Sequence, residues 1–280
     1  MNLTVSRASL EEWRQAVAWA KAEGWNPGEG DETCFHPTDP EGFFLGRLDD
    51  GRVVSAISVV TYSPAFAFLG FYLVHPEFRG RGLGLATWQA AFPHAGERTV
   101  GLDAVPEQED TYKRSGFTSA YRTLRYSGRP AAAQHPLDAV PFTADRLGAV
   151  TAYDRHCFPA ERPAFLRRWL TADGHTAYVR LRDGRISGYG VIRPAGQGYR
   201  IGPLFADSAD DAGAVFDALT ATLEPGHEVS LDIPEPHAAA CAMAQAWGLT
   251  AVSHTVRMYH GAAPTTPVER VFGVTTLELG

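Results

Sequence analysis

The fold of this chain is decided by one stretch, Leu69-Gly-Phe-Tyr-Leu-Val-His-Pro-Glu-Phe-Arg-Gly-Arg-Gly-Leu-Gly84, and by the residues 85–92 that follow it. The apolar run from Phe66 to Val74 predicts a buried strand, and a turn centred on Pro76 comes next. Apolar residues then recur at helical spacing over 82–92 until a proline ends the helix. The sequence therefore predicts a strand, a turn and a helix in direct succession.

The turn in this stretch has the composition of an anion-binding site. Arg79-Gly80-Arg81-Gly82-Leu83-Gly84 places three glycines at a helix N-terminus, where backbone N–H groups can approach a ligand closely. The helix dipole favours negative charge at this end, and arginine forms charge-assisted hydrogen bonds with phosphate oxygens. We expect a cradle for a diphosphate or a similar polyanion.

The bulk composition limits the class of protein. The chain has 280 residues, 45% of them apolar, 20% charged, and a net charge of −7, which is unlike the basic surface of a non-specific nucleic-acid binder. We expect neither a signal peptide nor a membrane span. Cys34, Cys157 and Cys241 are far apart and lack metal-ligand spacing, which indicates free thiols in a reducing cytoplasm and no metal site. The expected assembly is a monomer or a homodimer.

The order of predicted elements repeats along the chain. Residues 1–127 give one helix, several strands, a helix, a strand, a helix and a strand, with a long loop expected over 25–41. A segment rich in proline and alanine over 128–141 predicts a linker. Residues 142–280 repeat the order and finish with an extended segment over 268–279. We therefore expect two domains of similar architecture.

Two blocks, residues 69–84 and Tyr112-Lys-Arg-Ser-Gly-Phe117, stand in the right order and about 30 residues apart to resemble the GCN5-related N-acetyltransferase (GNAT) superfamily. The whole chain resembles a tandem bacterial form of the YitH type, with support from 200–207 and from the ending 272–280. The resemblance implies an α/β (α+β) tandem GNAT fold, with two mixed, mostly antiparallel sheets that are each flanked by helices.

The resemblance also implies where acetyl-CoA would bind. Backbone groups of one strand end would pair with its pantetheine arm, and the glycine turn would hold its pyrophosphate. The predicted cofactor-binding residues are Tyr72, Leu73, Val74, Arg79, Gly80, Arg81, Gly82, Leu83, Gly84 and Leu85. One position departs from the family pattern, because Val105 stands where many members carry an asparagine that contacts pantetheine. No matching turn exists in the second half, where Ala206-Asp-Ser-Ala-Asp-Asp211 is acidic and would repel a pyrophosphate. That half is expected to shape the acceptor site instead.

Two residues are predicted to catalyse the transfer. The resemblance places Tyr112 near the sulfur, where its hydroxyl can protonate the leaving thiolate. The amine arrives protonated, so a base must accept a proton, and Asp103 in the strand after the cofactor helix is the predicted base. His75, Glu77 and Glu32 are the alternatives.

The predicted function is transfer of an acetyl group from acetyl-CoA directly to the amine of a small molecule. The alternatives are a non-catalytic acyl-CoA-binding regulator, a protein or peptide N-acetyltransferase, and an aminoacyl transferase of the peptidoglycan type. The last of these binds tRNA, which requires a basic surface that this acidic chain lacks.

Overall fold

The computed structural model describes residues 2–131, 133 and 138–280. Its helices are α1 (Leu10–Ala22), α2 (Glu32–Phe35), α3 (Leu83–Ala91), α4 (Glu109–Arg114), α5 (Leu147–Asp154), α6 (Pro163–Trp169), α7 (Ala209–Thr220) and α8 (Ala238–Ala246). Its strands are β1 (Leu3–Arg7), β2 (Phe43–Leu48), β3 (Val53–Thr61), β4 (Phe66–Val74), β5 (Thr99–Ala104), β6 (Thr118–Gly128), β7 (Val140–Pro141), β8 (Thr176–Arg182), β9 (Arg185–Pro194), β10 (Tyr199–Ala206), β11 (Val229–Pro234), β12 (Thr250–His260) and β13 (Val271–Gly273). Of the predicted linker, residues 132 and 134–137 lie outside the described residues.

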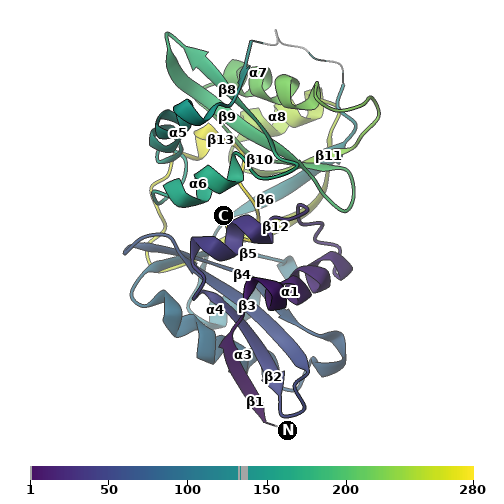
Figure 1. Cartoon of the computed structure of the whole chain (residues 1–280), viewed down its shortest axis with the longest axis vertical. Helices are drawn as coiled ribbons and strands as arrows, with labels where there is room; N and C mark the ends of the chain where they lie inside the picture. The colour runs from purple at the N-terminus through teal and green to yellow at the C-terminus, as the bar shows by residue number, and fades with distance from the viewer. Residues whose placement is uncertain (1, 132, 134–137) are drawn as a thin grey trace.

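The two halves share one continuous sheet. The strands follow the order β1-β2-β3-β4-β5-β12-β6-β11-β10-β9-β8-β7, and β13 pairs with β10 off this path. Figure 1 shows the first half below and the second half above, joined through the middle of the sheet. The mixed α/β class and the tandem fold are confirmed. The two expected sheets are joined edge to edge into one, because hydrogen bonds continue across the boundary between the halves.

The halves exchange strands at this junction. Strand β12 of the second half pairs with β5 of the first along Val100–Ala104, while β6 of the first half pairs with β11 of the second. Strands β6 and β12 also pair with each other in an antiparallel ladder. Each half therefore completes its sheet with a strand from the other, and the two cannot separate without breaking three strand pairs.

The apolar side chains follow the same division. On one face of the sheet a single core contains α1 and α2 of the first half together with α5 and α6 of the second. Phe35 of α2 stacks on Trp169 of α6 with ring centroids 5.7 Å apart, which joins the halves directly. On the other face, α3 packs over the first half and α7 over the second in separate cores. Burial of these large side chains on both faces stabilises the arrangement of the strands.

Most local predictions are confirmed. Helix α1 begins with a capping box, in which the Ser9 hydroxyl accepts a hydrogen bond from the Glu12 amide and the Glu12 carboxylate accepts one from the Ser9 amide. The strand over 66–74 is β4 with the same bounds, and the helix at 82–92 is α3. The prediction of a loop over 25–41 was incomplete, because this segment contains α2 and a 3₁₀ turn. Cys34 and Phe35 of α2 enter the shared core.

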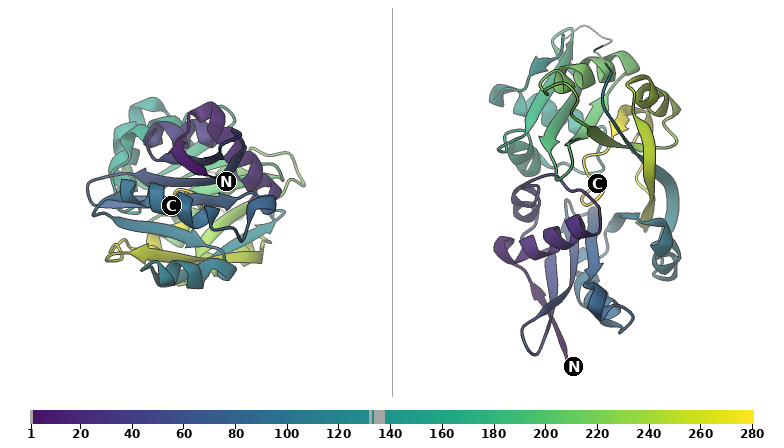
Figure 2. Two further views of the ribbon diagram at one scale, coloured as in Figure 1. Left: turned by 90° about the horizontal axis from the view of Figure 1, so that it is seen from below. Right: turned by 90° about the vertical axis from the view of Figure 1, so that its right-hand side faces the viewer.

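The C-terminal residues do not stay within the second half. After β13 the chain runs between the two halves, and Figures 1 and 2 place its end near the middle of the molecule. The Arg162 guanidinium donates a hydrogen bond to the Thr275 hydroxyl at 2.9 Å, and the Tyr62 hydroxyl donates one to the Leu279 carbonyl at 3.0 Å. Residues from both halves therefore fix this segment, residues 274–280, which we call the tail.

Candidate active site

The site begins where two parallel strands separate. Strands β4 and β5 pair only at Phe66–Phe68 with Thr99–Gly101 within the described part of the chain. Beyond this point β4 continues to Val74 and β5 to Ala104 without a shared ladder. The edge of β4 from Leu69 onward therefore faces a wedge-shaped gap, and its backbone groups can pair with an extended ligand as with an added strand.

A cavity of about 950 Å³ fills this gap. It runs from the glycine turn, past β4 and β5, to the tail. Its lining includes nine of the ten predicted cofactor-binding residues and both predicted catalytic residues. Arg81 is the exception, being exposed with its guanidinium 5.4 Å from the centroid of the Phe78 ring. The residues that the sequence singled out are thus brought together by the fold.

Strand β4 carries a bulge at the centre of the cavity. The register with β3 shifts between Ala56 and Ser58, so Phe71 and Tyr72 stand opposite the single residue Ile57. Phe71 has φ of 47°, which is a strained conformation for a residue with a side chain. A bulge frees backbone groups from the ladder and turns them toward new partners. Backbone N–H groups freed in this way are suited to donate hydrogen bonds to a ligand in the cavity.

The glycine turn has the local geometry that an anion cradle would need. Gly82 is the N-cap of α3 at φ of 77°, and no side chain caps the helix. The first turn of α3 therefore presents its unpaired N–H groups to the cavity. A Cβ atom at Gly80 or Gly82 would meet nothing within 4 Å, so the turn leaves open space beside these donors. The side chain of Leu85, 59% exposed, borders the same space.

The first arginine of the turn has partners within the chain. Arg79 donates through Nε to the Val74 carbonyl at 3.0 Å and forms an ion pair with Glu23. Arg79 therefore ties the turn to β4 and to the end of α1. The backbone of the turn, more than this side chain, offers free donors to an anion.

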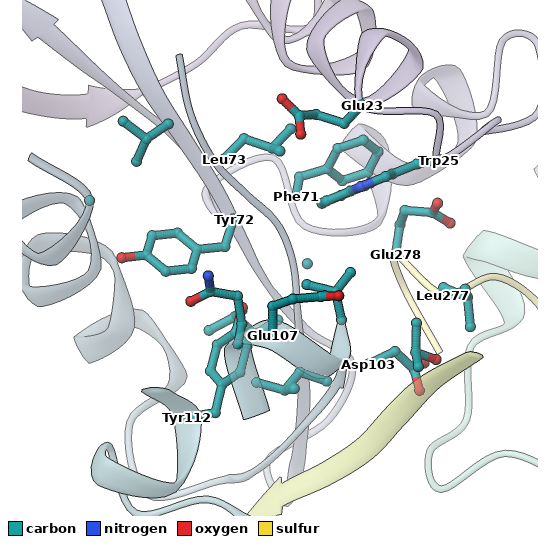
Figure 3. Close-up of a pocket in the computed structure, with 18 of the residues that line it drawn as sticks. Glu23, Trp25, Phe71, Tyr72, Leu73, Asp103, Glu107, Tyr112, Leu277 and Glu278 are labelled. Atoms are coloured by element: carbon teal, nitrogen blue, oxygen red, sulfur yellow. The ribbon is translucent and has the colours of Figure 1, made fainter. Parts of the chain in front are cut away.

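Tyr112 lies inside the cavity with its ring packed against aromatic neighbours. Its ring centroid is 6.4 Å from that of Tyr72 and 5.8 Å from that of Trp88. Figure 3 shows the ring projecting from α4 into the cavity, toward the side chain of Tyr72. Burial raises the pKa of the Tyr112 phenol above its usual range, so the hydroxyl stays protonated at neutral pH. Among the described residues nothing forms a hydrogen bond with this hydroxyl, which is free to donate.

Asp103 lies on the opposite wall, with its side chain buried in an ion pair. Its two oxygens accept hydrogen bonds from Arg257 Nε at 3.0 Å and Nη2 at 2.7 Å. Burial raises the pKa of the Asp103 carboxyl, and Arg257 offsets part of that rise. The alternatives His75, Glu77 and Glu32 are not among the residues that line the cavity.

Most of the lining residues were not singled out from the sequence as site residues, among them the following four. Trp25 and Arg125 come from the first half, whereas Leu277 and Glu278 come from the tail. Figure 3 shows Glu278 on the same side of the cavity as Trp25 and Phe71. A Cβ atom at Gly70 would lie 2.1 Å from the Glu278 carbonyl oxygen, so glycine at this position allows the tail to touch β4. The only signal in the sequence was the ending 272–280, which indicated the family but no role.

The corresponding gap in the second half is closed. Strands β10 and β11 also pair in parallel at only two positions, Tyr199 with Val229 and Arg200 with Ser230, within the described residues. Strand β13 then enters between them: it pairs with β10 at Leu204 and Phe205, and the Val274 amide donates to the Asp232 carbonyl at 2.9 Å. The protein's own backbone thus occupies the place that an extended ligand has in the first half.

The helix beyond this second gap is also capped. Ser208 is the N-cap of α7 and its hydroxyl accepts from the Asp211 amide. Burial alone would raise the pKa of the Asp211 carboxyl, but hydrogen bonds from Ser208, Arg182 and Ser187 hold it below its usual range. A carboxylate of the protein therefore takes the position at the helix N-terminus that an anion would need.

In the part of the chain that the structure describes, no group of three or more His, Cys, Asp and Glu side chains is placed to hold a metal ion. No helix among these residues has the length and apolar character that crossing a membrane requires.

The splayed strands, the bulge and the uncapped glycine turn define an acyltransferase of the GNAT type, and the comparisons agree. Residues 10–117 match the model of the acetyltransferase (GNAT) family, and residues 150–273 match that of an acetyltransferase (GNAT) domain. The chain is 36% identical over 278 residues to the holothin acyltransferase of Pseudoalteromonas sp. (strain SANK 73390), covering 99% of this chain and 94% of that protein. The protein therefore belongs to the GNAT family as a tandem member and is an acyltransferase.

Two further relatives extend this placement. The uncharacterized N-acetyltransferase YitH of Bacillus subtilis (strain 168) is 25% identical over 218 residues, which cover 76% of each chain. The crystal structure of a putative acetyltransferase from Pyrococcus horikoshii superposes with a TM-score of 0.84 at 20% identity, covering 99% of this chain and 96% of that one. At that identity the superposition shows the shared fold alone.

Proposed function

We propose that this protein transfers an acetyl group from acetyl-CoA to the amine of a small molecule, by direct attack while both substrates are bound. The proposal rests chiefly on one observation: the β4–β5 gap is open, leads from an uncapped helix N-terminus, and contains the Tyr112 hydroxyl. Residues 1–127 would hold the donor, and 142–280 would complete the acceptor side. The three free thiols fit a cytoplasmic protein.

The donor would lie along β4. The first-turn N–H groups of α3 suit its pyrophosphate, while the free edge of β4 suits its pantetheine amides. The bound thioester supplies an activated acyl group, and backbone donors beside Phe71 are positioned to stabilise charge on its carbonyl oxygen. Val105 also lines the cavity. Its apolar side chain would hold the pantetheine arm more weakly than the asparagine that many family members carry at this position.

Tyr112 is the proposed acid. Its protonated hydroxyl faces the cavity without a competing acceptor, so it can donate to a leaving thiolate. Asp103 stays a prediction as the base. Its raised pKa suits proton acceptance, but its two oxygens are already engaged by Arg257.

A small acceptor is favoured over a protein. The acceptor side of the cavity is lined by Leu277 and Glu278 of the tail, together with Trp25 and Phe71. Because the relative from Pseudoalteromonas is a holothin acyltransferase, holothin is the first acceptor to test.

The test is release of CoA from acetyl-CoA across holothin, amino acids, polyamines, aminoglycosides and drug-like amines, with the products identified by mass. We expect turnover with at least one small amine. Tight binding of acetyl-CoA without CoA release from any of them would instead indicate a regulator.

Replacing Tyr112 with phenylalanine tests the acid. We expect Tyr112→Phe to lower kcat about 10²-fold and to leave the KM for acetyl-CoA within about twofold, since only proton donation is lost. Tyr199→Phe is the matched control, because Tyr199 lies in the second half, outside the cavity lining. An unchanged kcat in Tyr112→Phe would remove the proposed acid.

A further inference from the structure

The tail brings a buried carboxylate into the cavity. Glu278 is 4% exposed, and no hydrogen bond to its carboxylate is found among the described residues. It nevertheless lines the cavity, beside the Trp25 and Phe71 side chains. Leaving a buried carboxylate without a hydrogen-bond partner is costly, so such a group indicates a missing donor. Glu278 lines the cavity, so a ligand bound there could supply this donor.

The charges around Glu278 leave it available as a proton acceptor. Arg125 of β6 donates through Nε to Asp232 of β11 at 2.7 Å, and Arg200 of β10 also pairs with Asp232. Both arginines act on Glu278 only through space, and Asp31 and Asp232 oppose them. Burial is the larger influence and raises the pKa of the Glu278 carboxyl. Arg125 is thus engaged with Asp232, whereas Arg200 pairs with Asp232 through Nη2 and keeps a buried Nε without a hydrogen-bond partner among the described residues.

Glu278 and Asp103 differ in their freedom to act. Asp103 accepts two hydrogen bonds from Arg257 and a third from the Thr123 hydroxyl at 3.5 Å. Protonating Asp103 would leave the buried Arg257 charge unpaired, which is expensive. Protonating Glu278 would break no hydrogen-bonded ion pair of this kind among the described residues. Its backbone is held by Tyr62 at Leu279 and by the contact of the tail with Gly70, so its position is fixed while its carboxylate remains free.

We propose that Glu278 binds the ammonium group of the acceptor and acts as the general base that deprotonates it. The flat apolar walls of Trp25 and Phe71 beside this carboxylate fit an amine attached to an aromatic or otherwise planar apolar body. This inference rests on the proposed function, because it assigns the base and the acceptor class of the same site.

The proton transfers balance as follows. A Glu278 oxygen accepts one proton from the ammonium, which frees the nitrogen lone pair, and later releases that proton to solvent. The nitrogen then forms a bond with the acyl carbon while the carbon–sulfur bond breaks, and Tyr112 gives its proton to the thiolate. The nitrogen loses its second proton through water to the tyrosinate, which restores Tyr112. The products are one amide, one CoA thiol and one proton.

The first experiment compares amines that differ in protonation. Benzylamine is an ammonium ion at pH 7, whereas aniline is already neutral. We expect Glu278→Gln to lower kcat/KM for benzylamine about 10²-fold and for aniline less than about fivefold, since aniline has no first proton to lose. Glu278→Asp should retain part of the benzylamine activity. Glu32→Gln, at a buried carboxylate outside the cavity lining, is the matched control.

The second experiment measures binding without turnover. Calorimetry of benzylamine with the CoA complex should show weaker binding in Glu278→Gln than in wild type, with CoA affinity unchanged in both. Equal binding, or equal loss of activity toward both amines, would overturn the role of Glu278.

These outcomes separate the two proposals. Acetyl transfer by wild type together with full activity of Glu278→Gln contradicts only the base assignment. Absence of CoA release from wild type with every amine contradicts the proposed function, and the binding comparison then still decides whether Glu278 forms an amine site.

Discussion

The two halves of this protein contain the same pair of splayed parallel strands and differ in what lies between them. In the first half the β4–β5 gap is a cavity of about 950 Å³, and α3 begins at Gly82 without a side-chain cap. In the second half β13 pairs with β10 inside the gap, and Ser208 with Asp211 caps α7. One arrangement offers backbone donors to a ligand, whereas the other satisfies them within the chain. The comparison shows how a repeated fold can leave one gap open, as the proposed binding site, and fill the corresponding gap in its copy with its own backbone.

The largest expected effect is a loss of acetyl-CoA binding when Gly82 is substituted, in contrast to Gly226 of the second half. Gly82→Asp should weaken acetyl-CoA binding at least about 10²-fold in calorimetry, because it places a carboxylate where the first turn of α3 faces an anion. Gly226→Asp is the control, since Gly226 of the second half also has positive φ, and a side chain added there would find no atom within 4 Å of its Cβ. It should cost only about 1–2 kcal/mol of stability from backbone strain and leave binding intact. Comparable loss of binding in both variants would contradict the cradle.

The next prediction concerns the segment that closes the second gap. Phe272→Ala should reduce the free energy of unfolding by about 3–5 kcal/mol, since Phe272 is fully buried in the second-half core. It should also lower kcat, because β13 leads directly into the tail that carries Glu278. Phe216→Ala, equally buried in the same core but on α7, should destabilise similarly and retain kcat.

Calorimetry of the same variants tests the closed gap itself. One acetyl-CoA per chain is expected in wild type and in both phenylalanine variants, because Asp211 still occupies the N-terminus of α7. A second equivalent in Phe272→Ala would mean that β13 alone excludes the ligand.

The smallest effect is a gain in stability. The pKa of Glu278 is raised in the folded protein, so the folded state binds its proton more tightly than the unfolded chain does. The stability that Glu278 contributes is therefore fully present below its unfolded pKa of about 4.3, and it is lost as the pH rises through its folded pKa. Glu278→Gln removes this loss, and its melting temperature should exceed that of wild type by a few degrees at pH 7 but not at about pH 4. A constant difference across this range would contradict the buried, unpaired carboxylate.

The local structure of the proposed donor side could be predicted well from the sequence because its signals are local. A strand, a glycine turn and a helix follow each other over 66–92, and short-range sterics and helix-end electrostatics dictate their conformation. The cap of α1 at Ser9 and the position of Tyr112 in the cavity were accessible for the same reason.

The acceptor side could not be predicted in this way. Glu278 meets Gly70 only because β13 and the tail pass between the halves, which brings together residues from opposite ends of the chain. The strand exchange of β6 and β12 also leaves no periodic pattern that distinguishes it from two separate sheets. Pairing of Asp103 with Arg257 likewise depends on β12 lying beside β5. Long-range pairing determines these features, and single-sequence patterns do not encode it.

The strand exchange has a consequence for the order in which the protein is made. A ribosome completes the first half, with its glycine cradle, long before β12 emerges to cover β5 along Val100–Ala104. Until then that edge is open to pairing with other chains, and neither Arg257 nor Glu278 has been synthesised. A chain that stops within the second half would thus have the proposed donor cradle without the residues that line the proposed acceptor side. The proposed transfer becomes possible only once the tail is in place.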